Sequence, residues 1–524
     1  MDEQKCPRTP MSSLSRIAFK TVCSQLEKSL SNEKASASFA CGGTIPVKCT
    51  HAANLRSSTA EEVPETGERL KSSGPVNIFW ELNDASTARK LTLPLSTSVE
   101  TNDSSSSMTR LGQLVADCEP APFGRNQETV LDTQYRKAGK LETHQFATTF
   151  HPADFGIIER VEQVLLPSLQ KLMQQFLEIR RLEVELYKLN VYSGPSGLFK
   201  SHVDTPRSKN QIGSLVVCLP SPFKGGSLIV RHGGREVKFG WEHQSADTIQ
   251  WAAFYSDCEH EITMVNQGER ITLTYNLYAV TELLDKADRV SAIIDPKSFP
   301  LYRDFKNLLE MPGFMKTGGV LGAFCSHAYP HATSDASILL PRGLKGADLV
   351  FYSALHALGV EVDVLPVMLG HGYKNTKDDW WDSDEGKEPD HDTNSDDDDE
   401  DGDNGRKKRR RKNKKNQDSN GPLEYLDPGK KVRVGKCLNS YVAAEMYEEE
   451  PFSEILNENW PTRCYEKPIT WVTAPRPENI RAAMTYMAYG NEASQAEVYS
   501  YAAIIAVIPP WTERQKLLAK LEEK

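Results

Sequence analysis

Residues 183–192 read EVELYKLNVY, and their apolar and polar side chains alternate with a period of two. This alternation is typical of a β-strand. Further segments with strand character follow at short intervals, at residues 212–219, 227–239, 248–255, 261–265 and 270–280. In the 227–239 segment the turn is His232-Gly233-Gly234, because adjacent glycines accept the positive φ angles of a tight hairpin. Closely spaced strands of this kind predict a β-sandwich or a jelly-roll barrel.

The segment before these strands has a different period. Apolar residues recur at about helical spacing through residues 155–183, from Ile157 to Ile179. We expect a helix over this whole segment, kinked or divided at Pro167, because proline has no backbone N–H to donate. The helix would cover the strands that follow it.

The composition of the remaining segments predicts which of them are ordered and which are disordered. Polar and charged residues are concentrated near the N-terminus and in an acidic run at 378–403 followed by a basic run that begins at Arg406 and ends at Lys415. Such runs stay solvated. Residues 96–108 are expected to form a polar loop, and residues 349–369 are apolar enough for a core. The expected segments are a disordered tail (1–74), a helical or mixed flanking region (75–182), the barrel (183–281), a mixed α/β extension (282–374), a disordered acidic-then-basic linker (375–422), and a C-terminal region (423–524) that packs on the core or forms a small domain.

Bulk composition excludes several classes of protein. The chain has 524 residues, of which 39% are hydrophobic and 26% charged, as in globular proteins. Its ten cysteines form no CxxC pair, which indicates reduced thiols in an intracellular protein rather than a disulfide framework or a zinc ribbon. The N-terminus lacks the apolar segment of a secretory signal. The longest apolar run, YAAIIAVIPP at 501–510, is too short to span a membrane and is expected to be a buried element.

A candidate metal site comes from three residues. His202 and Asp204 are separated by one residue, so in an extended segment both side chains lie on the same face and can reach one ion. His260 begins a later strand, and in a jelly roll this spacing returns the chain to the partner sheet, opposite the first pair. Two histidines and one carboxylate on one face of an octahedron leave three open positions. This facial triad is associated with non-haem Fe(II) oxygenases.

A candidate anion site follows on the same strand. Arg270 lies ten residues after His260, and alternation places Arg270 and Thr272 on one inward face. A buried guanidinium binds a carboxylate through two hydrogen bonds, and Thr272 adds a hydroxyl group. This pair suits the distal carboxylate of 2-oxoglutarate, whose other end would chelate iron.

Together these motifs resemble the prolyl 4-hydroxylase-like branch of the 2-oxoglutarate/Fe(II)-dependent dioxygenases. The resemblance rests on HxD at 202–204, a histidine some fifty residues later, an arginine ten residues beyond it in GERIT, YSG at 192–194 and GGSL at 225–228. It covers residues 184–280. Residues 116–180 also resemble a flanking region of large fungal-type members. The fold class implied is α+β: a double-stranded β-helix (jelly-roll) core with flanking helices and an additional C-terminal α/β region.

The resemblance also implies roles. His202, Asp204 and His260 would be the catalytic iron ligands, Arg270 would anchor 2-oxoglutarate, and Thr272 and Tyr192 would be further co-substrate contacts. Fe(II), 2-oxoglutarate, O2 and ascorbate would be the cofactor set. The reaction would couple decarboxylation of 2-oxoglutarate to succinate with hydroxylation of a substrate C–H bond.

One departure bears on the substrate. The nucleic-acid demethylases of this superfamily carry Asn two residues after the arginine and a second Arg six residues after it, whereas this chain has Thr272 and Asn276. This difference argues against nucleic acid as substrate and favours a protein or peptide, oxidised at a side chain such as proline. Two alternatives remain: an oxygenase of a small molecule, and a catalytically inactive scaffold in a nuclear complex.

Other residues receive simpler interpretations. His232, at a turn tip, and His243, in a polar loop, are expected to be exposed to solvent. Cys258 is expected to be a small buried side chain, and Trp251 and Phe254 core aromatics, while Tyr255 is a candidate to line the pocket. His327 and His331 have the spacing of a metal pair, but no nearby carboxylate completes it. The basic run ending at Lys415 is a candidate nuclear import signal; otherwise the protein would be cytoplasmic. The sequence does not indicate an oligomeric state.

Overall fold

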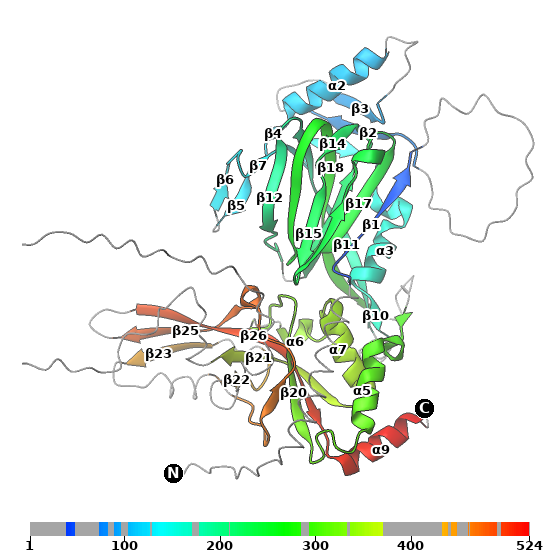
Figure 1. Ribbon diagram of the computed structural model, residues 1–524. Helices are drawn as coiled ribbons and strands as arrows, with labels where there is room; N and C mark the ends of the chain where they lie inside the picture. The colour runs from blue at the N-terminus through cyan, green and yellow to red at the C-terminus, as the bar shows by residue number, and fades with distance from the viewer. Residues whose placement is uncertain are drawn as a thin grey trace, which may run out of the picture.

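The structure is a computed structural model that describes most of the chain (Figure 1). It comprises a jelly-roll unit, formed by described residues up to 283, and a C-terminal unit, formed by described residues from 293 onward. The described residues are 38–47, 73–81, 88–95, 103–125, 128–169, 178–208, 210–283, 293–332, 336–369, 432–438, 442–447, 460, 462–489 and 494–522. The expected acidic and basic linker lies outside them, and so does the candidate import signal.

The larger sheet of the jelly roll has the strand order β1-β17-β13-β18-β11-β8-β4. Its strands are β1 (Ala40–Pro46), β4 (Glu119–Pro120), β8 (Gly139–Glu142), β11 (Glu178–Ser193), β13 (Gln211–Cys218), β17 (Thr248–Tyr255) and β18 (Glu259–Leu283). All pairings in this sheet are antiparallel. Every residue of β13 is buried, because β17 and β18 flank it and both of its faces are covered.

The smaller sheet shares β18 with the larger one. The first half of β18 pairs with β12 (Gly197–Val203), β14 (Phe223–Gly225) and β15 (Leu228–His232), and its second half pairs with β11 and β13. β16 (Arg235–Phe239) and β7 (Arg136–Lys137) complete the smaller sheet. At Gly268 the backbone has a φ of 77°, and a Cβ there would lie 2.2 Å from the carbonyl oxygen of Pro222. A glycine is therefore required where β18 passes between the sheets. The predicted double-stranded β-helix is confirmed.

The hairpin predicted in residues 227–239 is also confirmed. β15 and β16 pair around Gly233 and Gly234, whose φ angles are 60° and 77°. These left-handed conformations are open to glycine, which explains why this dipeptide forms the turn.

The helix expected over residues 155–183 is wrong in its second half. Helix α3 (Ile157–Leu165) ends two residues before Pro167, and β11 has begun by Glu178. Glu178 and its successors pair with the end of β18, which satisfies their backbone groups across the sheet. Tertiary pairing thus overrides a local pattern that fits a helix as well as a strand.

The N-terminal expectations also need correction. Residues 40–46 were expected to belong to a disordered tail, yet they form β1 and pair with residues 248–254 of β17. Gly42 and Gly43 allow this approach, since a Cβ on Gly42 would lie 2.6 Å from the Trp251 carbonyl oxygen. The expected polar loop at 96–108 is helical from residue 103, within α2 (Asp103–Asp117). The other flanking elements are β2 (Val76–Trp80), β3 (Arg89–Leu93), β5 (Phe123–Arg125), β6 (Glu128–Val130), β9 (Phe146–Thr148) and β10 (Ser168–Leu169), which pairs with β19 (Ile293–Ile294).

The C-terminal unit joins two distant parts of the chain in one sheet, ordered β22-β21-β26-β20-β24. Its strands are β20 (Gly319–Phe324), β21 (Glu361–Leu369), β22 (Val432–Val434), β23 (Val442–Tyr447), β24 (Ile469–Trp471), β25 (Arg481–Tyr489) and β26 (Ser494–Ile508). Its helices are α5 (Pro300–Glu310), α6 (Ala336–Leu339), α7 (Gly346–Ala357) and α9 (Trp511–Glu522). This is the predicted additional α/β region. The apolar stretch at 349–369 is core, as expected, and the 501–510 run lies largely in the buried part of β26.

The lengths and hydropathy of the described helices bear on whether any of them could span a membrane. Among the described residues, none of the helices combines the length and the apolar character that a membrane span requires.

Candidate active site

The structure brings His202, Asp204 and His260 together. His202 lies in β12 directly opposite His260 in β18, and Asp204 follows the end of β12. The two imidazole centroids are 4.2 Å apart with planes inclined at 52°, and Nε2 of His260 is 3.7 Å from Oδ1 of Asp204. One nitrogen or oxygen atom of each residue lies within 4.8 Å of those of the other two. These three residues are termed the open cluster.

Both histidine rings are held through Nδ1. Nδ1 of His202 donates to the Lys200 carbonyl oxygen at 2.8 Å, and Nδ1 of His260 donates to the Cys258 carbonyl oxygen at 3.1 Å. A carbonyl oxygen only accepts, so Nδ1 carries the proton in each ring. In the neutral form of either ring, the lone pair is therefore on Nε2. Metal-binding histidines commonly have this arrangement, with the outer nitrogen bonded to a backbone carbonyl.

The charges in the open cluster suit a cation. Burial, and then the neighbouring His260, lower the pKa of His202 to about 3. Burial opposes ionisation of Asp204, but the two histidines and the Ser214 hydroxyl outweigh it and hold the Asp204 pKa below its usual value. Oγ of Ser214 donates to Oδ2 of Asp204 at 2.6 Å. A deprotonated carboxylate beside neutral imidazole is the state that metal binding requires.

Aromatic side chains restrict both rings further. Phe199 stacks on His202 with a centroid distance of 3.6 Å, and Phe254 contacts His260 at 4.6 Å. Phe254 is fully buried, so the His260 ring packs against a fixed wall. The two imidazole rings, and with them their Nε2 atoms, are therefore held in one orientation before a ligand binds.

Arg270 lies on the same strand as His260, inside the barrel. Its side chain is fully buried, and none of its three guanidinium nitrogens has a hydrogen-bond partner among the residues that the structure describes. The rings of Trp241 and Tyr192 lie 5.2 Å and 5.5 Å from the guanidinium carbon. Aromatic rings offset only part of the cost of burying a charge. The site is therefore built for an anion.

The two weaker candidates lie close to Arg270. Tyr192 pairs with Arg270 across β11 and β18 and is buried. Thr272 is buried too, and its hydroxyl is 3.4 Å from the Asn190 carbonyl oxygen, at the outer limit for a hydrogen bond. Arg270 and Thr272 are separated by one residue on β18 and therefore project from the same face of the strand, although Ile271 and Leu273 on the other face are buried as well.

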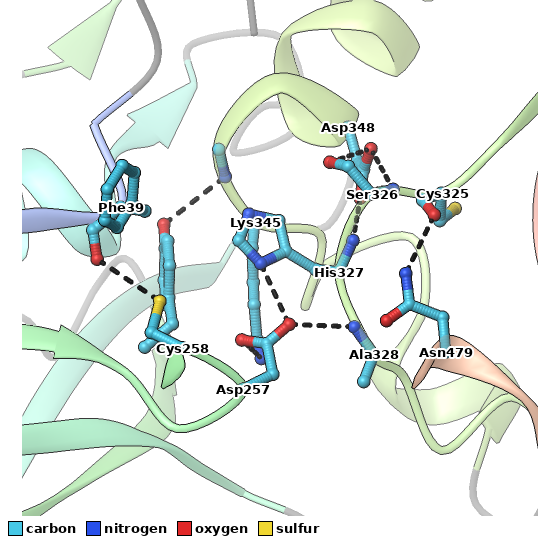
Figure 2. Close-up of polar contacts among 12 residues, drawn as sticks. Phe39, Asp257, Cys258, Cys325, Ser326, His327, Ala328, Lys345, Asp348 and Asn479 are labelled. Atoms are coloured by element: carbon cyan, nitrogen blue, oxygen red, sulfur yellow. Dashed lines mark hydrogen bonds and ion pairs between the residues drawn. The ribbon is translucent and has the colours of Figure 1, made fainter. Parts of the chain in front are cut away.

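A second group of the same residue types, His232, Asp257 and His327, is termed the closed cluster (Figure 2 shows Asp257 and His327). The two rings stack face to face at 4.1 Å with planes only 7° apart. Lone pairs of stacked parallel rings lie in separate planes and do not meet at one ion. Oδ2 of Asp257 accepts from Nδ1 of His327 at 3.0 Å, and Oδ1 accepts from Nζ of Lys345 at 3.2 Å. An ammonium group in this position also opposes a cation, so these residues do not fit a metal.

Of the remaining predictions about single residues, some are confirmed and others are wrong. His243 is exposed and Cys258 is buried, as expected. His232 was expected to be exposed, which is wrong, because its ring is covered by His327 of the C-terminal unit. Tyr255 does not line the pocket; its side chain is fully buried and its hydroxyl donates to the Leu165 carbonyl oxygen.

The supposed pair His327 and His331 does not form. His327 contacts Asp257, whereas Nε2 of His331 lies 2.9 Å from the Ser500 hydroxyl. Trp251 and Phe254 are core aromatics, as expected. Sequence reasoning missed Asp257, and the only signal was an acidic residue in the turn before His260.

A jelly roll that joins a His-Asp-His cluster to a buried, unpaired arginine defines the class: an iron-dependent oxygenase with an acidic co-substrate. Residues 187–278 match the family model described as the 2OG-Fe(II) oxygenase superfamily, which agrees with the span expected from the motifs. The chain thus contains a 2OG-Fe(II) oxygenase domain and is a dioxygenase whose cofactor set is Fe(II), 2-oxoglutarate and O2.

Several solved structures are similar to part of the chain. A Pseudomonas putida prolyl-4-hydroxylase is 16% identical, with 33% of this chain and 84% of that chain covered and a TM-score of 0.21. A Burkholderia pseudomallei oxidoreductase of the 2OG-Fe(II) oxygenase family is 14% identical, with 33% and 79% covered and a TM-score of 0.19. A Trichoplax adhaerens prolyl hydroxylase, in complex with a hypoxia inducible factor peptide fragment, is 12% identical, with 33% and 74% covered and a TM-score of 0.20. No curated protein matches the chain.

Proposed function

We propose that the protein is a 2-oxoglutarate-dependent hydroxylase of a protein side chain, with proline as the leading candidate. In this proposal His202, Asp204 and His260 hold Fe(II), and Arg270 binds the distal carboxylate of 2-oxoglutarate. Tyr192 and Thr272 line the co-substrate site. Bound iron would supply O2 activation coupled to decarboxylation of 2-oxoglutarate to succinate.

The observation that carries this proposal is the unpaired guanidinium of Arg270. Burying a charge without a partner costs several kcal/mol. Arg270 is 0% exposed and lacks a hydrogen-bond partner among the described residues. A carboxylate that accepts two of its N–H groups would remove that cost and would be fixed in orientation. Arg270 and His260 lie on one strand, β18, so both belong to the same jelly-roll core.

The other residues of the site prepare it for this chemistry. The Lys200 and Cys258 carbonyl groups keep the proton of each histidine on Nδ1, which leaves Nε2 free to bind. The Ser214 hydroxyl holds one oxygen of Asp204 and leaves the other near His260. Trp241 and Tyr192 pack around the arginine and exclude water from the anion site.

The residues around Arg270 also bear on the substrate class. Asn276 occupies the position where the nucleic-acid demethylases carry a second arginine. Its amide donates to Glu185 at 3.1 Å and its oxygen accepts from Gln211 at 3.3 Å. The position therefore holds an uncharged amide that links the exposed carboxylate of Glu185 to the buried side chain of Gln211. This supports a protein substrate over a nucleobase.

The test is anaerobic titration of Fe(II) and 2-oxoglutarate, followed by measurement of succinate in air. Arg270→Met should keep iron binding and lose about 3 kcal/mol of 2-oxoglutarate affinity, roughly 150-fold, because two charge-assisted hydrogen bonds disappear. Arg514→Met is the matched control, since Arg514 is also fully buried but lies in the C-terminal unit. Equal affinity in wild type and Arg270→Met would refute the assignment of Arg270. Iron and 2-oxoglutarate binding without any succinate would favour the inactive scaffold.

A further inference from the structure

A cavity of about 730 Å³ lies between the jelly-roll unit and the C-terminal unit. Its volume is within the range of small-molecule and peptide sites. Asp204 is the member of the open cluster that lines it. The opposite wall belongs to the C-terminal unit and consists of residues 328–330, 332, 338–340, 342, 343, 345 and 481, which include Arg342, Lys345 and Arg481. The cavity therefore connects the open cluster with a second, separately built surface.

Apolar side chains are exposed on both walls of this cavity. Val203 is 53% exposed beside Asp204, and Ile338 is 63% exposed on the C-terminal unit. Pro206 and Pro330 also contribute to the lining. Solvent-exposed apolar side chains that face one cavity from two units are typical of a site that another chain covers.

Cations outnumber carboxylates in the lining. The described lining contains four cations and two carboxylates: Arg180, Arg342, Lys345 and Arg481, and Asp204 and Asp257. Asp257 already accepts from Lys345 and His327. Asp204 belongs to the open cluster. Among the described lining residues, the four cations thus exceed the two carboxylates in number.

Two of these cations have neutral partners. The Arg180 guanidinium donates to the carbonyl oxygens of Arg342 and Pro167. The Arg481 guanidinium donates to the carbonyl oxygens of Glu478 and Ile480. Carbonyl groups orient a guanidinium without neutralising it, so an anionic ligand would be attracted to this wall.

We propose that this cavity is the substrate site and that it takes a polypeptide segment with an acidic residue close to the side chain to be oxidised. The inference rests on the proposed function and specifies its substrate. The apolar residues near Asp204 would pack against the oxidised side chain, and the cationic wall would bind the flanking carboxylate. The C-terminal unit is then a specificity element, placed by the contacts of Asp257 with His327, Ala328 and Lys345.

The test selects peptides from a fully degenerate nine-residue library on the full chain, loaded with Fe(II) and 2-oxoglutarate without oxygen. Retained peptides should contain Asp and Glu about five-fold above the input library, as expected for partly exposed charge pairs. Arg342→Gln combined with Arg481→Gln should abolish that excess. Arg303→Gln is the control, since Arg303 is an exposed cation of α5 outside the lining.

The outcomes separate the two proposals. A retained pool without acidic excess, or the same excess in the double variant, would overturn the inference. If no peptide is retained while the charge-transfer absorption shows bound iron and 2-oxoglutarate, the inference fails, the iron and 2-oxoglutarate assignments stand, and a small-molecule substrate takes its place. Absence of that absorption would instead overturn the proposed function.

Discussion

The open and closed clusters each consist of two histidines and one aspartate from neighbouring parts of the chain, and Asp257 precedes His260 by only three residues. In the open cluster the two rings are inclined at 52° and both Nδ1 atoms are bonded to carbonyl oxygens. In the closed cluster the rings are within 7° of parallel, and the carboxylate accepts from a lysine and a histidine. In the open cluster the candidate metal-ligating atoms remain close together and available. In the closed cluster the carboxylate oxygens already accept hydrogen bonds from protein side chains.

The difference shows that residue types do not define a metal site by themselves. The direction of the lone pairs and the charge beside the carboxylate decide it. The closed cluster connects the turn before His260 to the C-terminal unit, where Ser326, His327 and Tyr329 are held in turn by Asp348 (Figure 2 shows Ser326, His327 and Asp348). In the proposed function the open cluster holds iron, whereas the closed cluster links the jelly-roll unit to the C-terminal unit.

The largest expected contrast is in metal binding. Structural zinc sites with four ligands contribute about 10–16 kcal/mol, so by analogy one ligand is worth about 3–4 kcal/mol. Asp204→Ala should therefore weaken Fe(II) binding by several hundred-fold, while Asp257→Ala keeps it. Anaerobic titration and iron content per chain would measure both. More than one iron per chain in wild type, with the excess lost in Asp257→Ala, would contradict the distinction between the clusters.

The second contrast is in stability. Asp257→Ala leaves Lys345 and His327 without their buried partner, and breaking such a pair costs about 3 kcal/mol. Hydrogen exchange of the Ala328 amide, which donates to Asp257 at 2.9 Å, should accelerate by roughly 150-fold. Asp247→Ala is the control, because Asp247 is an exposed acid of the jelly roll. Unchanged protection of Ala328 would show that the closed cluster does not hold the units together.

The sequence predicts the open cluster because two of its residues are adjacent in the strand pattern and because the spacing in a jelly roll returns the third, His260, opposite them. The i, i+2 spacing of His202 and Asp204 and the ten-residue step from His260 to Arg270 are fixed by strand geometry. The closed cluster depends on docking, since His327 lies 70 residues beyond Asp257 and belongs to the other unit. No local period carries that pairing. For the same reason, β1, with its GG pair, could not be recognised without β17 beside it.

A third contrast is the pH dependence of the stability that His232 contributes in the closed cluster. Burial, and then His327, lower the pKa of His232 from 6.5 to about 3. The unfolded chain therefore binds this proton more readily, and stability is fully present above pH 6.5 and lost as the pH falls toward 3. The loss between pH 6.5 and 5 should be about 2 kcal/mol. Hydrogen exchange against pH should show this loss in wild type and in the exposed control His243→Asn, but not in His232→Asn. Equal slopes in all three would contradict a buried neutral His232.

The smallest contrast lies within the open cluster. Ser214→Ala removes the hydrogen bond to Oδ2 of Asp204 but keeps the ligand itself, and loss of such a supporting contact costs about 10-fold in metal affinity. The Asp204 pKa should also rise, because the Ser214 hydroxyl helps to hold it down. The affinity loss should therefore widen as the pH is lowered. Ser221→Ala is the matched control: Ser221 is fully buried, and its hydroxyl has no partner among the described residues. A loss that stays constant with pH would mean that Ser214 positions Asp204 without affecting its charge.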